Sequence, residues 1–211
     1  EREREVDVII VEIGGTVGDI ESLPFLEAIR QLRWELGEHH ALNIHVTLLP
    51  YIKSAGEQKT KPTQHSVGRL REIGIAPDIL LCRTEKHITK EERDKIALFC
   101  NVDREAVIEA ADVKHIYEVP LMFKKEGLDD LILKKLNIKR EERDLKEWKN
   151  FVVKRLKDPQ KEIKIHVVGK YISLPDAYKS IYEALVHGGI ANNTRVQIIK
   201  VDSEDLEKPK I

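Results

Sequence analysis

Short apolar runs alternate along the first 120 residues with segments whose apolar positions recur at helical spacing. Val6–Val11 and Ile44–Leu49 are rich in β-branched residues and are typical of buried strands in a parallel sheet. Further strands are predicted at Ile79–Cys82, Val107–Ala110 and Ile116–Val119. Because helical segments separate these runs, the pattern predicts βαβ units and an α/β fold with a mostly parallel, doubly wound sheet.

Three helices are predicted between these strands. Apolar residues at helical spacing mark the first helix over 25–36, and Gly37 is a plausible stop. A second helix begins around Pro62 or Thr63 and ends at Gly74, with Val67 and Leu70 facing inward. The sequence Thr-Lys-Glu-Glu over 89–92 is a capping box that opens a third helix, which ends near residue 99.

The composition changes after residue 134. The segment 134–161 is dense in charge and carries apolar residues at helical spacing from Leu145 to Leu156, which indicates an amphipathic connector. The earlier pattern then restarts with a strand at Ile163–Val168, a helix at Pro175–Val186 and a strand at Arg195–Val201. About fifty residues are too few for a complete α/β domain. We therefore expect a first domain over 1–136, a linker over 137–161 and the opening of a second domain over 162–211.

Charge and cysteine content exclude several classes of protein. The chain has 36 basic and 37 acidic residues, without the basic excess that is typical of proteins binding nucleic-acid polymers. Its two cysteines form no metal or disulfide motif, and no apolar run approaches the roughly 20 residues that a membrane span requires. These features predict a cytoplasmic protein without membrane contact.

Glu12–Ser22 is a glycine-rich turn that carries several acids. Glu12 stands at the carboxyl end of the first predicted strand, where open α/β sheets bind ligands, and a carboxylate there can hold Mg²⁺ against nucleotide phosphates. Asp19 and Glu21 follow after three glycines that permit close backbone approach to a ligand. A tight strand–helix turn with solvated acids would contain the same residue types. The glycine spacing matches neither a Rossmann fingerprint nor a P-loop.

The segment Gly56–Ser66 is a candidate anion site. Lys59 and Lys61 lie just before a predicted helix, so their charges add to the free N–H groups of its first turn. Thr60, Thr63 and Gln64 add neutral hydrogen-bonding groups, although a solvated loop with an ordinary threonine cap would also fit. We expect this helix entrance and the acidic turn to converge around one nucleoside triphosphate, with the lysines on phosphate and the acids near the base.

At these two segments together, the sequence strongly resembles the CTP synthases. The resemblance extends over essentially the whole chain. The supporting segments are Ser22–Gln31, Lys95–Val102, Gly127–Asp130, Val168–Ile172 and Leu174–Ser180. It implies an incomplete synthase domain of the P-loop, dethiobiotin-synthetase-like type, followed by the opening β-α-β of a class I glutamine amidotransferase domain.

The resemblance also implies a reaction and a set of site residues. The reaction is the ATP-dependent amination of UTP to CTP, in which O4 of UTP is phosphorylated and glutamine-derived ammonia displaces the phosphate. Glu12 would ligate Mg²⁺, and the backbone at Ala111, Asp112 and Val113 would contact ATP. UTP or the inhibitor CTP would contact Asp19, Ile20, Glu21, Lys59, Thr60, Lys61, Pro62, Thr63, Gln64 and Lys95. The family also implies a homo-oligomer, a tetramer in the full-length enzyme.

Two expected parts of such an enzyme have no counterpart in this sequence. No segment matches the family's P-loop or the cysteine elbow of its glutaminase triad. We therefore expect that the 211-residue chain makes no CTP by itself. A non-catalytic UTP- or CTP-binding module, such as a nucleotide sensor, is the alternative function, and an assembly protein is a third.

Overall fold

A computed structural model describes residues 6–139 and 144–207. Its contacts divide the chain into two compact units, Glu1–Glu141 and Glu142–Ile211. Each unit has its own parallel strand pairing. The units are therefore described separately.

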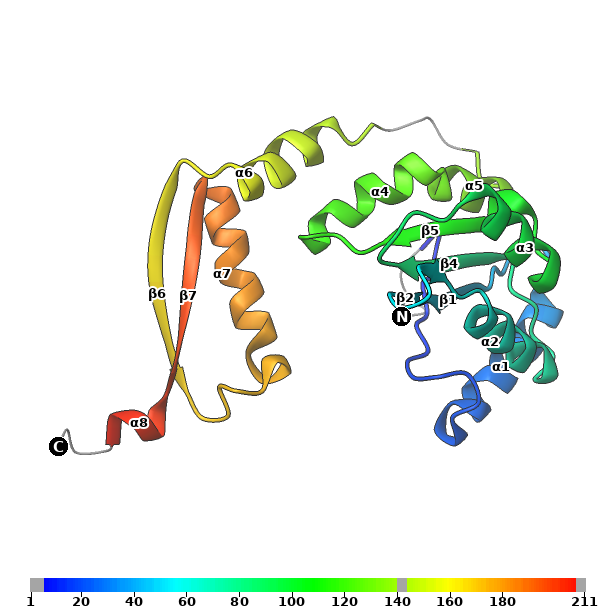
Figure 1. Ribbon diagram of the computed structural model, residues 1–211, viewed down its shortest axis with the longest axis horizontal. Coiled ribbons are helices and arrows are strands. Elements are labelled where there is room, and N and C mark those ends of the chain that lie inside the picture. Colours follow the sequence, from blue (N-terminus) through cyan, green and yellow to red (C-terminus); the bar gives the residue numbers. More distant parts are fainter. Residues whose placement is uncertain (1–5, 140–143, 208–211) are drawn as a thin grey trace. The chain divides into compact units, whose positions relative to one another are not determined.

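A three-stranded parallel sheet forms the centre of the first unit (Figure 1). Its strands are β1 (Ile44–Leu49), β4 (Ile79–Thr84) and β5 (Val107–Ala111), in the order β1-β4-β5. Ile44 pairs with Ile79, and Leu80 pairs with Val107. The three predicted strands are thus confirmed, and β4 and β5 run two residues and one residue further than predicted.

Helices cover both faces of this sheet. Since successive side chains of a strand point to opposite faces, Leu80 and Cys82 pack in one core cluster and Ile79 in another. The first cluster includes residues of α2 (Lys61–Glu72) and α3 (Lys90–Cys100). Residues of α4 (Val119–Glu126) and α5 (Leu128–Lys135) pack in the second cluster. These helices lie across the sheet from α2 and α3 in Figure 1. The expected doubly wound α/β class is confirmed.

A third core cluster holds α1 (Leu23–Leu36) against the C-terminal half of α2. Leu26 of α1 packs there with Leu70 and Ile75. The side chain of Arg33 also donates to the Asp78 carboxylate, which accepts from the backbone N–H of Asn43 at 2.8 Å. Gly37 ends α1 with a φ of 83°, as the sequence predicts.

Two predicted strands are absent from the described residues. Val6–Val11 forms no strand, and Ile10 is 92% exposed, because no neighbouring strand supplies hydrogen-bond partners to this run. Ile116–Val119 instead forms a 3₁₀ turn (Ile116–Glu118) that leads into α4. Pro120 explains this difference, since it lacks the N–H that a strand needs and fits the first turn of a helix.

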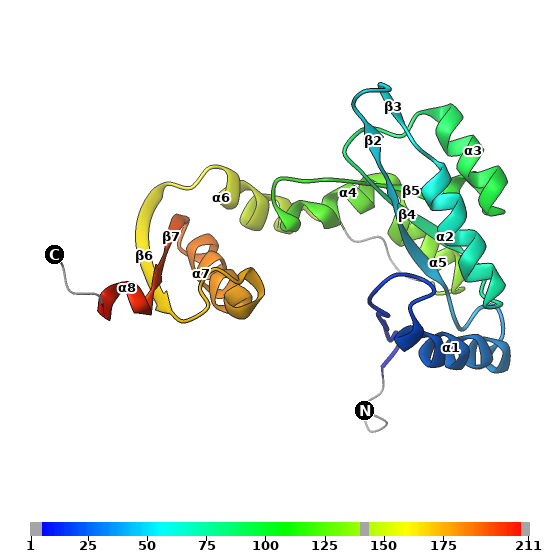
Figure 2. The same cartoon turned by 60° about the horizontal axis from the view of Figure 1, so that its bottom comes forward.

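The structure adds a hairpin where the sequence predicts only a polar loop. Strands β2 (Tyr51–Ile52) and β3 (Glu57–Gln58) pair antiparallel directly after β1 and lead into α2 (Figure 2). Both strands are only two residues long, so their sequence carries no periodic signal.

The second unit is a parallel β-α-β arrangement. Strand β6 (Lys161–Gly169) pairs with β7 (Thr194–Asp202), and α7 (Lys179–Ala191) packs against β7. A 3₁₀ turn (Pro175–Tyr178) precedes α7, and α8 (Ser203–Glu207) follows β7. The predicted connector contains a π-helical segment (Trp148–Val153) that continues into α6 (Lys154–Lys157), while residues 140–143 lie outside the described part. The domain limits 1–136, 137–161 and 162–211 remain a prediction.

Within residues 6–139 and 144–207, no helix combines the length and apolarity that crossing a bilayer requires.

Candidate functional site

The carboxyl ends of β1, β4 and β5 bring three loops to one edge of the sheet. The β2–β3 hairpin follows β1, residues 85–89 follow β4, and Asp112 follows β5. Thr84 joins them: its hydroxyl accepts from Gln58 Nε2 at 2.8 Å, and its carbonyl accepts from Asp112 N at 2.9 Å. This edge is where open α/β sheets bind ligands.

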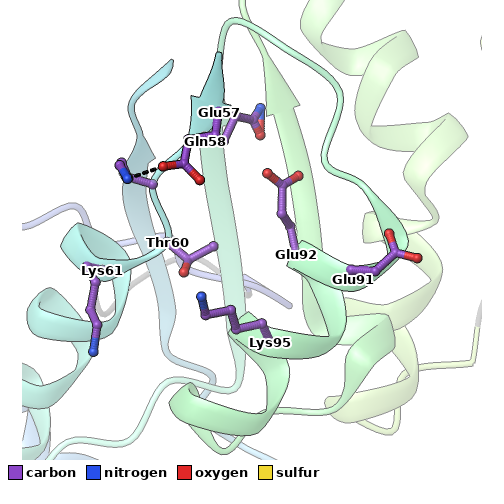
Figure 3. Close-up of a pocket in the computed structure, with 8 residues that line it drawn as sticks. Glu57, Gln58, Thr60, Lys61, Glu91, Glu92 and Lys95 are labelled. Carbon is purple, nitrogen blue, oxygen red and sulfur yellow. Dashed lines mark hydrogen bonds and ion pairs between the residues drawn. The ribbon is translucent and has the colours of Figure 1, made fainter. Parts of the chain in front are cut away.

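A pocket of about 340 Å³ lies at this edge, between the hairpin, the start of α2 and the start of α3 (Figure 3). Three lysines and three glutamates line it together with one glutamine and one threonine. They are Glu57, Gln58, Lys59, Thr60, Lys61, Glu91, Glu92 and Lys95. The charged side chains of the lining therefore balance, and the lysines offer sites for an anion.

Local structure explains where the cations stand. Thr60 is the N-cap residue of α2, so Lys59 and Lys61 flank the helix start and its unpaired N–H groups. The N–H of Lys59 donates to Pro50 O at 3.0 Å, which fixes its backbone on the hairpin. Lys95 comes from α3 and points toward Thr60 in Figure 3. Two separate elements thus supply positive charge to one cavity, an arrangement suited to a polyanion such as a triphosphate.

The capping box of α3 holds its first turn in place. Thr89 Oγ1 accepts from Glu92 N at 3.2 Å, and the Glu92 carboxylate accepts from Thr89 N at 2.8 Å. Residues 91, 92 and 95 share one face of the helix because they stand three and four positions apart. The predicted box is confirmed, and it orients the face that carries Lys95 toward the pocket.

Lys59 and Glu57 form an ion pair inside the pocket, drawn as the dashed line in Figure 3. The hydrogen bond from Lys59 lowers the pKa of the Glu57 carboxyl, and the charge of Lys95 contributes a smaller lowering. Lys61 instead lies with its ammonium 5.9 Å from the centre of the Phe99 ring. Lys59 and Lys61 thus each have a contact that a ligand would exchange or retain.

The other predicted residues near α2 take different positions. Thr63 is fully buried, and its hydroxyl donates to Thr47 Oγ1 at 3.0 Å and to Leu48 O at 3.2 Å. Gln64 Nε2 donates to Thr60 Oγ1 at 3.1 Å, and Pro62 is exposed in the first turn. Direct ligand contact by Pro62, Thr63 and Gln64 stays a prediction.

The acidic turn lies at the far end of α2. Asp19 closes it by accepting from Thr16 N at 2.8 Å, and Gly18, with a φ of 105°, lies against the side chain of Arg69 near the C-terminus of α2. Lys61 and Arg69 are eight residues apart on that helix, a rise of about 12 Å. Ile20 and Glu21 are exposed. The structure therefore does not bring the acidic turn and the lysines into one pocket of this chain.

Glu12 is an exposed carboxylate on that same segment. No cluster of three or more His, Cys, Asp or Glu side chains with metal-binding geometry occurs among the described residues. A single carboxylate suits Mg²⁺ that takes its remaining ligands from phosphates and water, and does not suit a metal held by protein groups alone.

Ala111, Asp112 and Val113 lie at the end of β5, at the same edge of the sheet as the pocket. Ala111 ends the strand, and the Asp112 carboxylate accepts from Arg83 Nε at 2.9 Å. The side chain of Asp112 is thus engaged with β4, while the backbone of the segment borders the carboxyl edge. This position is compatible with the expected backbone contacts to ATP, which stay a prediction.

Four residues of the pocket lining were given no role in the sequence prediction: Glu57, Gln58, Glu91 and Glu92. Spacing on the capped helix could have indicated the last two, since Lys95 was already a candidate. Glu57 and Gln58 lie in the candidate segment Gly56–Ser66, but their place in the pocket lining depends on the short hairpin.

Comparison with known proteins places the chain in a family. The family model described as CTP synthase N-terminus matches residues 1–138. A CTP synthase of Methanocaldococcus jannaschii is 61% identical over 95% of this chain, and one of Carboxydothermus hydrogenoformans is 57% identical over 100% of this chain. The chain spans 37% and 39% of the length of these two relatives. By the family model and these identities, the chain belongs to the CTP synthase family.

Proposed function

We propose that this chain supplies the pyrimidine-triphosphate site of an enzyme that aminates UTP to CTP. The enzyme uses ATP to phosphorylate O4 of UTP, and ammonia from glutamine then displaces that phosphate. The observation that carries the proposal is the pocket at the carboxyl edge of the sheet, where Lys59, Lys61 and Lys95 line one cavity. Membership of the family supports the identity of the ligand.

The charge of the ligand matches the lysines of this pocket. A nucleoside triphosphate carries several negative charges, and charge-assisted hydrogen bonds from ammonium groups are stronger than neutral ones. In phosphoryl transfer, positioning and charge neutralisation account for most of the catalysis. Glu12 would hold Mg²⁺, which would neutralise further phosphate charge when bound. The lysines would hold the triphosphate so that the pyrimidine ring is fixed relative to ATP near 111–113.

We also propose that the enzyme is a homo-oligomer, in line with the tetramer expected of the family. The acidic turn and the lysine pocket lie at opposite ends of α2, so one copy does not surround a nucleotide with both. An acidic turn from a second copy would complete the site with Asp19, Ile20 and Glu21 near the base. In this arrangement the lysines bind the phosphates and the acids lie near the base, as expected from the sequence.

Substitution of Lys59 tests the proposed site. In a calorimetric titration with UTP, Lys59→Ala is expected to weaken binding about 10- to 100-fold, because a hydrogen bond to a charged group contributes about 1.5–3 kcal/mol. Lys125→Ala removes an exposed lysine of α4 that does not line the pocket, and is the matched control. An unchanged UTP affinity in Lys59→Ala would remove Lys59 from the site.

UTP-dependent hydrolysis of ATP separates the enzyme from a nucleotide sensor. A full-length protein that carries this segment should hydrolyse ATP faster when UTP is present. The isolated 211-residue chain should bind UTP without this activity. A full-length protein that binds UTP but shows no UTP-dependent hydrolysis would favour the non-catalytic sensor.

A further inference from the structure

The charge balance of the pocket poses a problem for a polyanionic ligand. Three glutamates accompany the three lysines in its lining, so a triphosphate would meet three carboxylates as well as three ammonium groups. Like charges at short range oppose binding. The contacts of each glutamate decide how the pocket accommodates a ligand of this charge.

The glutamates differ in what holds them. Glu92 is fixed by the capping box of α3, where its carboxylate accepts from Thr89 N. Glu91 points away from the lysines in Figure 3. Glu57 lies on β3 two residues before Lys59, and its carboxylate accepts a hydrogen bond from the Lys59 ammonium. Among the interactions described for the pocket, Glu57 is thus the carboxylate engaged with one of its lysines.

The exposed position of Glu57 allows its carboxylate to move away from Lys59. Its side chain is 55% exposed and follows Gly56, which has a φ of 64° in the turn of the hairpin. A carboxylate at such a site can rotate into water without breaking a core contact. Phosphate and carboxylate oxygens bind an ammonium group in the same way, so a ligand phosphate can take the position that the Glu57 carboxylate occupies on Lys59.

We propose that Glu57 is a specificity-determining residue of this site: it is an internal counter-ion for Lys59 that ligand phosphates must displace. The proposal rests on the proposed function, since it concerns the same pocket. The lowered pKa of Glu57 agrees with a carboxylate that stays ionised beside Lys59 at neutral pH. A ligand with several phosphate charges replaces this contact and also reaches Lys61 and Lys95, whereas an uncharged nucleoside gains nothing from displacing it.

Calorimetric titration of the 211-residue chain with UTP tests the proposal. Glu57→Gln is expected to bind UTP about two- to five-fold more tightly, because an exposed ion pair makes only a modest contribution. Glu91→Gln removes the same charge from the lining without freeing Lys59 and should tighten binding less. Glu72→Gln, at the other end of α2, should leave the affinity unchanged. Equal or weaker UTP binding by Glu57→Gln, or equal tightening by Glu91→Gln, would overturn the proposal.

A double substitution shows whether Glu57 acts through Lys59. In the Lys59→Ala background, Glu57→Gln should tighten UTP binding no more than Glu91→Gln does in that background. If Glu57→Gln tightens UTP binding as much in the Lys59→Ala background as in the wild type, the counter-ion role is contradicted. Thermal melts check that each variant is folded, as expected for substitutions of a half-exposed side chain.

Inorganic tripolyphosphate separates failure of this inference from failure of the proposed function. If the wild-type chain binds tripolyphosphate but shows no preference for UTP over it, the pyrimidine site is wrong. The effect of Glu57→Gln can then still be measured with tripolyphosphate. If UTP binds preferentially and Glu57→Gln changes neither ligand, the counter-ion role alone is wrong.

Discussion

Two buried cysteines make the stability of the first unit depend on pH. Cys82 of β4 and Cys100 at the end of α3 belong to one core cluster, and both are fully buried. Burial disfavours the thiolate and raises the pKa of each thiol to about 11. Neither cysteine can therefore serve as a nucleophile near neutral pH while the first unit is folded.

The raised pKa of these thiols predicts a loss of stability in alkaline solution. Below about pH 9 both the folded and the unfolded chain keep the thiols protonated. The contribution of the buried thiols to the free energy of unfolding is then fully present. Between about pH 9 and 11 the unfolded chain loses the protons first, so the free energy of unfolding falls by roughly 2–3 kcal/mol for each thiol. Urea denaturation at several pH values measures this slope, which should be shallower in a Cys82→Ala, Cys100→Ala variant.

The rate of reaction with a thiol reagent is a second test of the burial of these thiols. A disulfide reagent at pH 8 should label neither cysteine of the folded chain on the timescale of minutes and both in urea. Rapid labelling without denaturant would contradict the burial of Cys82 and Cys100.

At the scale of elements, local signals were predictable and pairing partners were not. The capping box of α3 and the stop at Gly37 depend on residues close in sequence, and both are confirmed. The run Val6–Val11 has the right composition for a strand, but a strand exists only when another strand supplies hydrogen bonds. The β2–β3 hairpin was missed for the opposite reason, because its two-residue strands have partners but no pattern.

The capping box of α3 should also contribute measurably to stability. Thr89→Ala removes the hydroxyl that accepts from Glu92 N and is expected to lower the free energy of unfolding by about 1 kcal/mol. Thr89→Ser keeps a hydroxyl at this position and is the matched control. Urea denaturation followed by circular dichroism measures both variants. Equal stability of Thr89→Ala and wild type would show that the box does not hold the helix start.

At the scale of the whole molecule, the site depends on tertiary structure that the sequence does not reveal. The sequence identified Lys59 and Lys61 as cations near a helix start, the family resemblance added Lys95, and the pocket brings these three together. It also suggested that Asp19 and Glu21 would join them, whereas packing of the acidic turn near Arg69 puts α2 between the two groups. The length of α2 sets the distance between the acidic turn and the lysines, and no local sequence motif predicts it.

The division into two units predicts that nucleotide binding belongs to the first. All eight residues that line the pocket lie in Glu1–Glu141, and so do the three core clusters that hold β1, β4, β5 and their helices. A chain of residues 1–141 should therefore fold and bind UTP within about two-fold of the affinity of the 211-residue chain, because the pocket's hydrogen bonds and charges are retained.

Calorimetry on the two chains, with Lys59→Ala in each, measures this independence. If the shorter chain melts cooperatively but binds UTP much more weakly, residues of the second unit contribute to the site. If it binds UTP equally and Lys59→Ala weakens both chains by the same factor, the first unit accounts for the binding without the second.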